Sequence, residues 1–145
     1  MTGSTSADEH VQRLIALTER LTQQIALDAD AFEARRSHEA ADRVEQTAKL
    51  ANLYRHETAR MKQDPAVIAG ASGELRRRLI RASEAFEAVL ARHGRALHAA
   101  KTITEGIVRA IAEEADRARA AVASYGPGAR AQSTATTAIA LNRRA

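Results

Sequence analysis

The stretch from residue 74 to residue 125 constrains the fold of this chain more than any other. It contains no proline, and its apolar residues recur at steps of three or four, which is the spacing of one face of an α-helix. A single helix of roughly fifty residues would be about 75 Å long, whereas a small domain is about 30 Å across. The stretch therefore predicts one long helix in an elongated molecule. The apolar positions of this face are Leu75, Leu79, Ala82, Phe86, Val89, Leu90, Leu97, Ala100, Ile103, Ile107, Ile111, Ala115, Ala118 and Val122.

The composition favours a thin helical bundle over other fold classes. Aromatic residues are limited to two phenylalanines and two tyrosines, and alanine is the commonest apolar residue. A deep, round core needs larger side chains, and β-branched residues nowhere alternate with polar ones as they do in a strand. We therefore expect an all-α fold, in which residues 7–125 form an elongated antiparallel helical hairpin or coiled-coil bundle. It would contain two or three long helices and be followed by a flexible C-terminal tail.

The first helical arm is expected over residues 7–62. Residues 1–6 are small and polar, so we expect them to be disordered. Ser6 and Glu9 form a capping box of the type S-x-x-E, which places the helix start at Ala7.

Residues 35–38 interrupt the apolar stripe of this arm, and two interpretations stay open there. Ser37 could cap a second helix. Alternatively the helix continues, because neither glycine nor proline stops it. A continuous arm of about 84 Å would match the later helix in length. We favour that hairpin, with a possible break near residues 35–38.

The connection between the arms is expected over residues 63–73. Asp64 precedes a proline and is therefore pushed out of helical geometry, and Ser72 can cap the long helix. That helix should occupy residues 74–124, because a Gly-Pro-Gly sequence follows it. The small, polar residues 126–145 are expected to form the flexible tail.

The sequence lacks the residue patterns of common catalytic and metal sites. There is no cysteine, which excludes disulfides and thiolate chemistry, and no zinc-binding H-E-x-x-H motif or phosphate loop. His93 and His98 are five residues apart, so they diverge by about 140° around a helix. We therefore expect no enzymatic activity, no metal and no cofactor.

The sequence also favours a cytoplasmic protein. The first ten residues have neither a basic start nor an apolar run, so no secretory signal is expected. No apolar run approaches the roughly 18 residues of a membrane span, so we expect no membrane insertion. The formal charge of +4 is modest. Without interleaved aromatic residues or a known module, it does not indicate nucleic-acid binding.

Tyr125 has two possible roles. It stands where the long helix should end, in a chain with few aromatic residues. It could close the end of the hairpin core, or it could be an exposed amphipathic anchor of the type that carries binding energy at interfaces.

The chain resembles the FlgN family of flagellar export chaperones, in an alphaproteobacterial version. The resemblance covers roughly residues 10–130. It rests on LIALTERLTQQIALDADAFEARRSHEAADRVEQTAKLANLY, on HGRALHAAKTITEGIVRAIAEEA, and on Tyr125-Gly126 with Gly128. The Y-G-P-G spacing here is tighter than the Y-G-x-x-G of better-known members.

The resemblance implies a function and three partners. Members of the family are cytoplasmic, helical and not enzymes. They bind the hook–filament junction proteins FlgK and FlgL and deliver them to the flagellar type III export gate. The matching tyrosine, Tyr125, would dock on the gate protein FlhA. Client binding is assigned to the C-terminal part, where apolarity leads us to choose Ile103, Ile107, Ile111, Val122, Ile139 and Leu141.

The apolar face also allows a different function. A structural or adaptor protein could self-associate as a coiled coil through the same seam. For an export chaperone we expect a monomer or a weak homodimer instead. The two hypotheses differ in whether the apolar face is covered by a second copy or by a client.

Overall fold

The computed structural model describes residues 2–125, with side chains from Thr5 onward. Within these residues it contains four helices: α1 (Thr2–Glu33), α2 (Ser37–Gln63), α3 (Ala66–Ala69) and α4 (Gly73–Ala123). No strand occurs among these described residues, so the all-α prediction is confirmed. The chain divides into two compact units, Met1–Lys101 and Thr102–Ala145. The expected flexible tail, residues 126–145, lies outside the described part of the chain.

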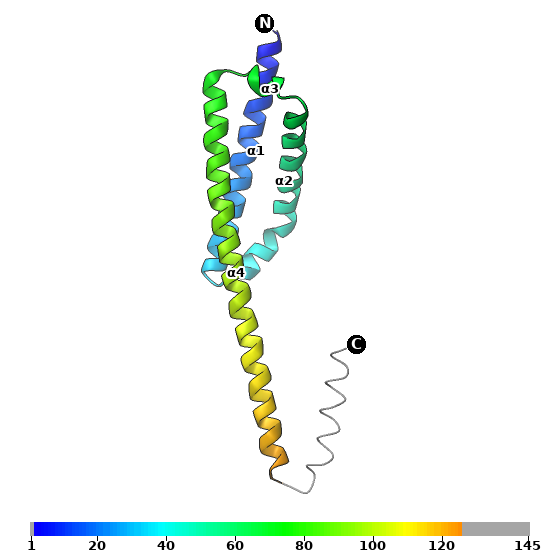
Figure 1. Ribbon diagram of the computed structural model, residues 1–145, viewed down its shortest axis with the longest axis vertical. Helices are drawn as coiled ribbons and strands as arrows, with labels where there is room; N and C mark the ends of the chain where they lie inside the picture. Colours follow the sequence, from blue (N-terminus) through cyan, green and yellow to red (C-terminus); the bar gives the residue numbers. More distant parts are fainter. Residues whose placement is uncertain (1, 126–145) are drawn as a thin grey trace. The chain divides into compact units, whose positions relative to one another are not determined.

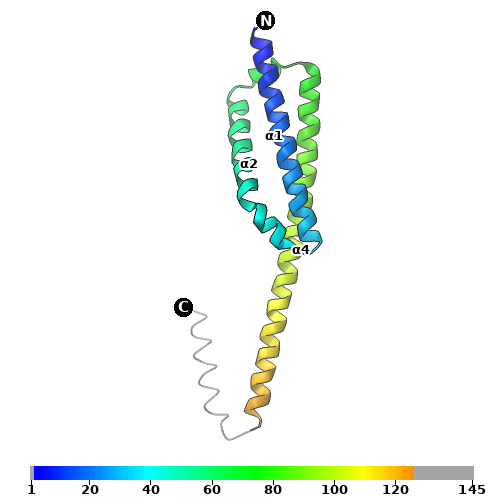
Figure 2. The ribbon, with the colours of Figure 1, turned by 180° about the vertical axis from the view of Figure 1, so that it is seen from behind.

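The first unit is a bundle of α1, α2 and the first part of α4. Both views show α1 running alongside the other two helices (Figures 1 and 2). The bundle core consists of two apolar clusters, each centred on residues of α1. One joins Ala7, Val11 and Ile15 to Ala71, Leu75 and Ala82. The other joins Leu21 and Ile25 to Leu50 of α2 and to the half-buried Leu17, Ala51, Tyr54, Phe86 and Val89.

The chain reverses between α1 and α2, so the favoured prediction of one continuous arm is wrong. Arg35 has a left-handed φ of 59°. The N–H of Arg35 donates to the Phe32 carbonyl at 3.2 Å, and the N–H of Arg36 donates to the Ala31 carbonyl at 2.7 Å. This is the Schellman pattern that ends a helix, with arginine in the position that glycine usually occupies. The alternative interpretation, a second helix beginning at Ser37, is the one the structure contains.

The N-terminal prediction is also wrong, because α1 begins at Thr2 and includes most of the segment expected to be disordered. The start of α4 agrees with expectation. The Ser72 hydroxyl accepts a hydrogen bond from the Leu75 N–H at 3.3 Å, while the Ser72 N–H donates to the Asp8 carboxylate at 2.8 Å. The first bond caps α4, and the second ties this cap residue to α1.

Two polar clusters connect the helices of the first unit. The buried carboxylate of Asp28 on α1 pairs with Arg43 of α2 at 3.0 Å. Arg92 of α4 binds Asp30 and also holds both carboxylate oxygens of Glu33 on α1, at 2.9 and 2.6 Å. The hydrogen bonds from Arg92 lower the pKa of Glu33 below its ordinary range.

The apolar seam predicted along all of α4 is only partly buried. Leu75, Ala82 and Ala96 are the buried residues of this helix, whereas Leu90 and Leu97 each expose 46 % of their surface. Because the chain reverses after residue 33, α1 and α2 are only about 48 and 40 Å long, against about 76 Å for α4. The prediction of two arms paired along their whole length is therefore wrong.

Candidate protein-binding surface

The second unit presents a row of exposed apolar side chains on the C-terminal part of α4. Every residue from 102 to 125 is exposed except the half-buried Ala112 and Ala115. The large apolar residues among them expose between 43 % and 64 % of their surface. We call this row the α4 stripe. It consists of Ile103, Ile107, Val108, Ile111 and Val122.

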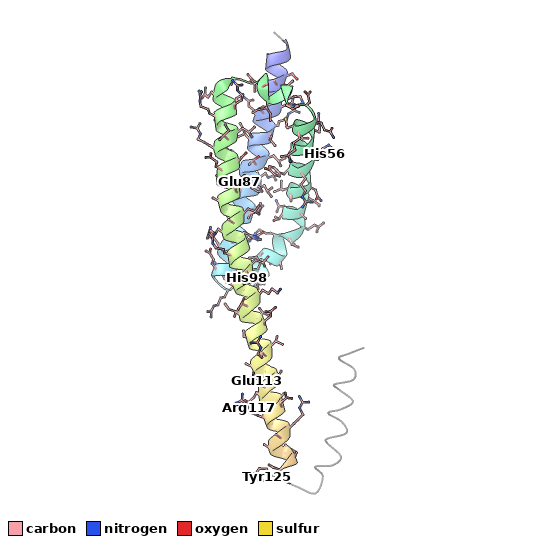
Figure 3. The ribbon with its side chains drawn as sticks, viewed as in Figure 1. His56, Glu87, His98, Glu113, Arg117 and Tyr125 are labelled. Atoms are coloured by element: carbon pink, nitrogen blue, oxygen red, sulfur yellow. The ribbon has the colours of Figure 1, made fainter. Side chains whose placement is uncertain are left out.

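The α4 stripe occupies one side of the helix. At 100° per residue, its members fall within an arc of about 140°. Arg109, Glu113 and Asp116 fall on the other side of the helix, and Figure 3 shows the side chains of Glu113 and Arg117 on this part of α4. Arg119 and Asp116 form an ion pair at 3.2 Å outside this arc, whereas Glu114, which pairs with Arg117, falls within it. An exposed row of large apolar side chains of this kind is typical of surfaces that contact another molecule.

Tyr125 follows the last turn of α4 and is 89 % exposed. Its N–H donates to the Val122 carbonyl at 3.2 Å, which holds the residue against the helix end (Figure 3). The side chain is therefore exposed and does not close the core of the described residues. Two other residues predicted to contact a client, Ile139 and Leu141, lie outside the described residues.

Sequence reasoning missed one apolar surface in the first unit. A groove of about 640 Å³ lies among the three helices of this unit and is lined by Phe32, Val44, Ala48, His93 and Leu97, among others. Phe32 and His93 meet edge to face, with ring centroids 5.7 Å apart. The periodic spacing of Leu97 placed it in a buried seam, and periodicity alone does not distinguish an exposed position from a buried one.

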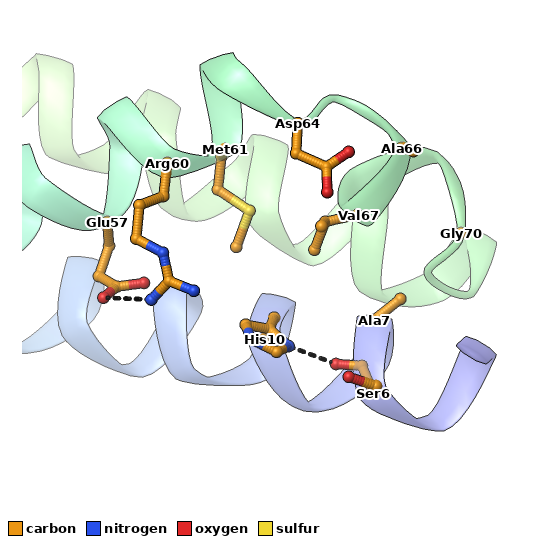
Figure 4. Close-up of a pocket in the computed structure, with 10 residues that line it drawn as sticks. All are labelled: Ser6, Ala7, His10, Glu57, Arg60, Met61, Asp64, Ala66, Val67 and Gly70. Carbon is orange, nitrogen blue, oxygen red and sulfur yellow. Dashed lines mark hydrogen bonds and ion pairs between the residues drawn. The ribbon is translucent and has the colours of Figure 1, made fainter. Parts of the chain in front are cut away.

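A second hollow, of about 460 Å³, lies at the end of the bundle that carries α3 (Figure 4). His10 Nδ1 lies 2.6 Å from the Ser6 carbonyl of its own helix, and Arg60 pairs with Glu57 at 3.6 Å. These polar groups are therefore engaged with neighbours on their own helices.

The described residues contain neither a cluster of metal-ligating side chains nor a helix that could span a membrane. Histidine, aspartate and glutamate nowhere gather there into a group of three that could hold a metal ion. In the same part of the chain, no helix combines the length and apolarity that a membrane span requires.

Comparisons with known proteins identify a relative. No family model matches the sequence, and no solved structure matches it. The flagellar basal-body protein FlbY of Caulobacter vibrioides is 52 % identical over 146 residues, which cover 99 % of this chain and 98 % of FlbY. Identity at this level over the full length shows common descent. The chain belongs to the family of the flagellar basal-body protein FlbY.

Proposed function

We propose that this protein is a flagellar export chaperone that binds the hook–filament junction proteins FlgK and FlgL. A flagellar role is supported by the relative, which is named a flagellar basal-body protein. The chaperone role is supported by the resemblance to the FlgN family. The single observation that carries the proposal is the α4 stripe, with its isoleucines exposed at intervals of four residues. The protein would act in the cytoplasm and without enzymatic activity.

The α4 stripe fits an amphipathic helix of a client. Helix-in-groove recognition uses apolar anchors three and four residues apart. Ile103, Ile107 and Ile111 are spaced by four residues, and Val108 lies three residues before Ile111. Full burial of an isoleucine is worth roughly 1.5–3 kcal/mol. Each half-exposed side chain of the stripe can still gain about half of that free energy when a client covers it. The whole stripe can therefore contribute several kcal/mol to client binding. Association itself costs about 4–15 kcal/mol, so the client's own apolar side chains must supply the remainder.

Tyr125 would dock the loaded chaperone on the gate protein FlhA. The support is the match to the family's terminal Y-G segment together with the exposure of the ring, which is the greatest among the large exposed apolar and aromatic residues of the described chain. Ile139 and Leu141, which follow in the sequence, would add apolar contacts to the client.

The proposal is tested by calorimetric titration of the full chain with purified FlgK and FlgL. Ile107→Asp places a charge in the α4 stripe and should weaken binding at least tenfold. Ala120→Asp is the matched control, because it adds the same charge at an exposed position about 140° around the helix from Ile107. It should weaken the affinity by only a few-fold, because it lowers helix propensity but leaves the stripe itself intact. Failure of the wild-type chain to bind either protein would contradict the proposed function.

Self-association is the second candidate function, because the same exposed stripe would suit a coiled coil between copies of this chain. Sedimentation equilibrium separates the two. A monomer or weak dimer that binds FlgK or FlgL supports the chaperone. A stable homo-oligomer that is broken by Ile107→Asp and binds neither client supports the adaptor.

A further inference from the structure

The helix that carries the α4 stripe has little packing to stabilise it. No side chain between residues 102 and 123 is buried, yet most helical stability in proteins comes from the packing of an apolar face. In the exposed ion pairs Arg117–Glu114 and Arg119–Asp116, the two partners lie three residues apart along the helix. Such pairs contribute only a few tenths of a kcal/mol each. The helical state of this segment therefore depends largely on intrinsic propensity.

Gly106 lowers that propensity without an evident packing reason. A Cβ atom built at this position would meet no atom within 4 Å, and the residue does not have a positive φ. Among the described residues, neither a turn nor a close approach requires glycine here. In a helix interior glycine costs about 1 kcal/mol relative to alanine. Its neighbours Ile107 and Val108 are β-branched and add a smaller cost.

We propose that residues 102–123 form a marginally stable helix in the free protein, and that Gly106 sets its helical fraction so that ordering is coupled to client binding. This inference rests on the proposed function and adds a means of regulating it. A client that binds only the helical state has an apparent Kd equal to the intrinsic Kd divided by the helical fraction. A glycine on the side of the helix away from the stripe weakens binding without altering the contact surface, which favours release of the client.

The coupling predicts that Gly106→Ala tightens binding. A gain of about 1 kcal/mol in helix stability is a fivefold change in the helix–coil equilibrium. For a helix populated between one tenth and one half of the time, the affinity for FlgK or FlgL should rise between about fourfold and twofold. Ala120→Gly, which lies away from the stripe, should weaken the affinity by a comparable factor.

Gly94→Ala is the matched control. Gly94 also lies inside α4, and a Cβ there would likewise meet nothing within 4 Å. It belongs to the first unit, however, so its replacement should leave the client affinity unchanged. The two variants make the same chemical change in the same helix and differ only in which segment they stabilise.

Hydrogen exchange of the full chain tests the helix without any client. Amides between residues 107 and 120 should exchange through local opening of the helix. Their exchange should be faster than that of the amides of the buried α1 residues. In Gly106→Ala their exchange should slow up to about fivefold, whereas Gly94→Ala should not change it. Strong protection of these amides in the wild-type chain would overturn the inference.

The exchange and calorimetric results separate the two proposals. If exchange slows in Gly106→Ala but client affinity does not rise, the coupling is wrong while the chaperone function stands. If the wild-type chain binds neither FlgK nor FlgL, the proposed function fails and the coupling to those clients fails with it. The exchange rates then still decide whether the helix is marginally stable.

Discussion

The division between the buried core and the exposed α4 stripe predicts different outcomes for two similar truncations, Leu21→Ala and Ile107→Ala. Both remove part of a large aliphatic side chain from a helix. Leu21 is 1 % exposed and belongs to the core cluster shared by α1, α2 and α4, whereas Ile107 is 55 % exposed. Buried leucine-to-alanine changes cost about 2–5 kcal/mol, including the cavity left behind. We expect about 3 kcal/mol for Leu21→Ala.

The loss should be visible in thermal unfolding followed by circular dichroism at 222 nm. At about 4–8 °C per kcal/mol for a unit of this size, Leu21→Ala should lower the melting temperature of the first unit by roughly 12–24 °C. Ile107→Ala should change stability by less than about 0.5 kcal/mol, since alanine also has the higher helix propensity. A loss above about 1 kcal/mol for Ile107→Ala would refute the reasoning, because it would mean that the stripe is already buried in the free protein.

Two further predictions concern the polar clusters of the first unit. Arg43→Ala removes the charged partner of the buried Asp28 carboxylate, which keeps the hydrogen bond from Thr47 at 3.5 Å. It should cost about 2 kcal/mol in urea unfolding. Asp28→Asn in the same background should recover part of this cost, and no recovery would contradict a cost due to a buried charge without its counter-ion. The pKa of Glu33 is lowered from its ordinary 4.5 by Arg92, so the stability that this carboxylate contributes is present above pH 4.5 and is lost as the pH falls through its lower folded-state pKa. Between about pH 6 and pH 3 the wild-type chain should therefore lose more stability than Arg92→Ala, and equal slopes in the two pH titrations of stability would contradict this assignment.

The sequence predicted the helical class and the start of α4 because both depend on local signals. Apolar spacing fixes a helix face, and Ser72 supplies the hydroxyl that caps α4. The reversal after α1 had no such signal. Arg35 adopts the left-handed conformation that glycine usually takes, so the absence of glycine argued for a continuous helix. A continuous first arm would pair with α4 along its whole length, so the predicted paired region was too long.

The candidate site could be predicted in part for the same reason. Periodicity placed Ile103, Ile107 and Ile111 on one face of the helix, and the structure has them there. Whether that face is covered depends on which other helices reach it, and this is a property of the tertiary fold. Leu97 shows the difficulty, because its spacing fits a buried seam and yet it is nearly half exposed.

The central claim is that a client covers the α4 stripe, and methyl NMR tests it most directly. The full chain, labelled at isoleucine methyl groups, would be titrated with unlabelled FlgK and then with FlgL. The account predicts that the methyl signals of Ile103, Ile107 and Ile111 shift or broaden, while those of the buried Ile15 and Ile25 stay unchanged. Binding that leaves the three stripe signals unperturbed would contradict the account and place the client elsewhere on the protein.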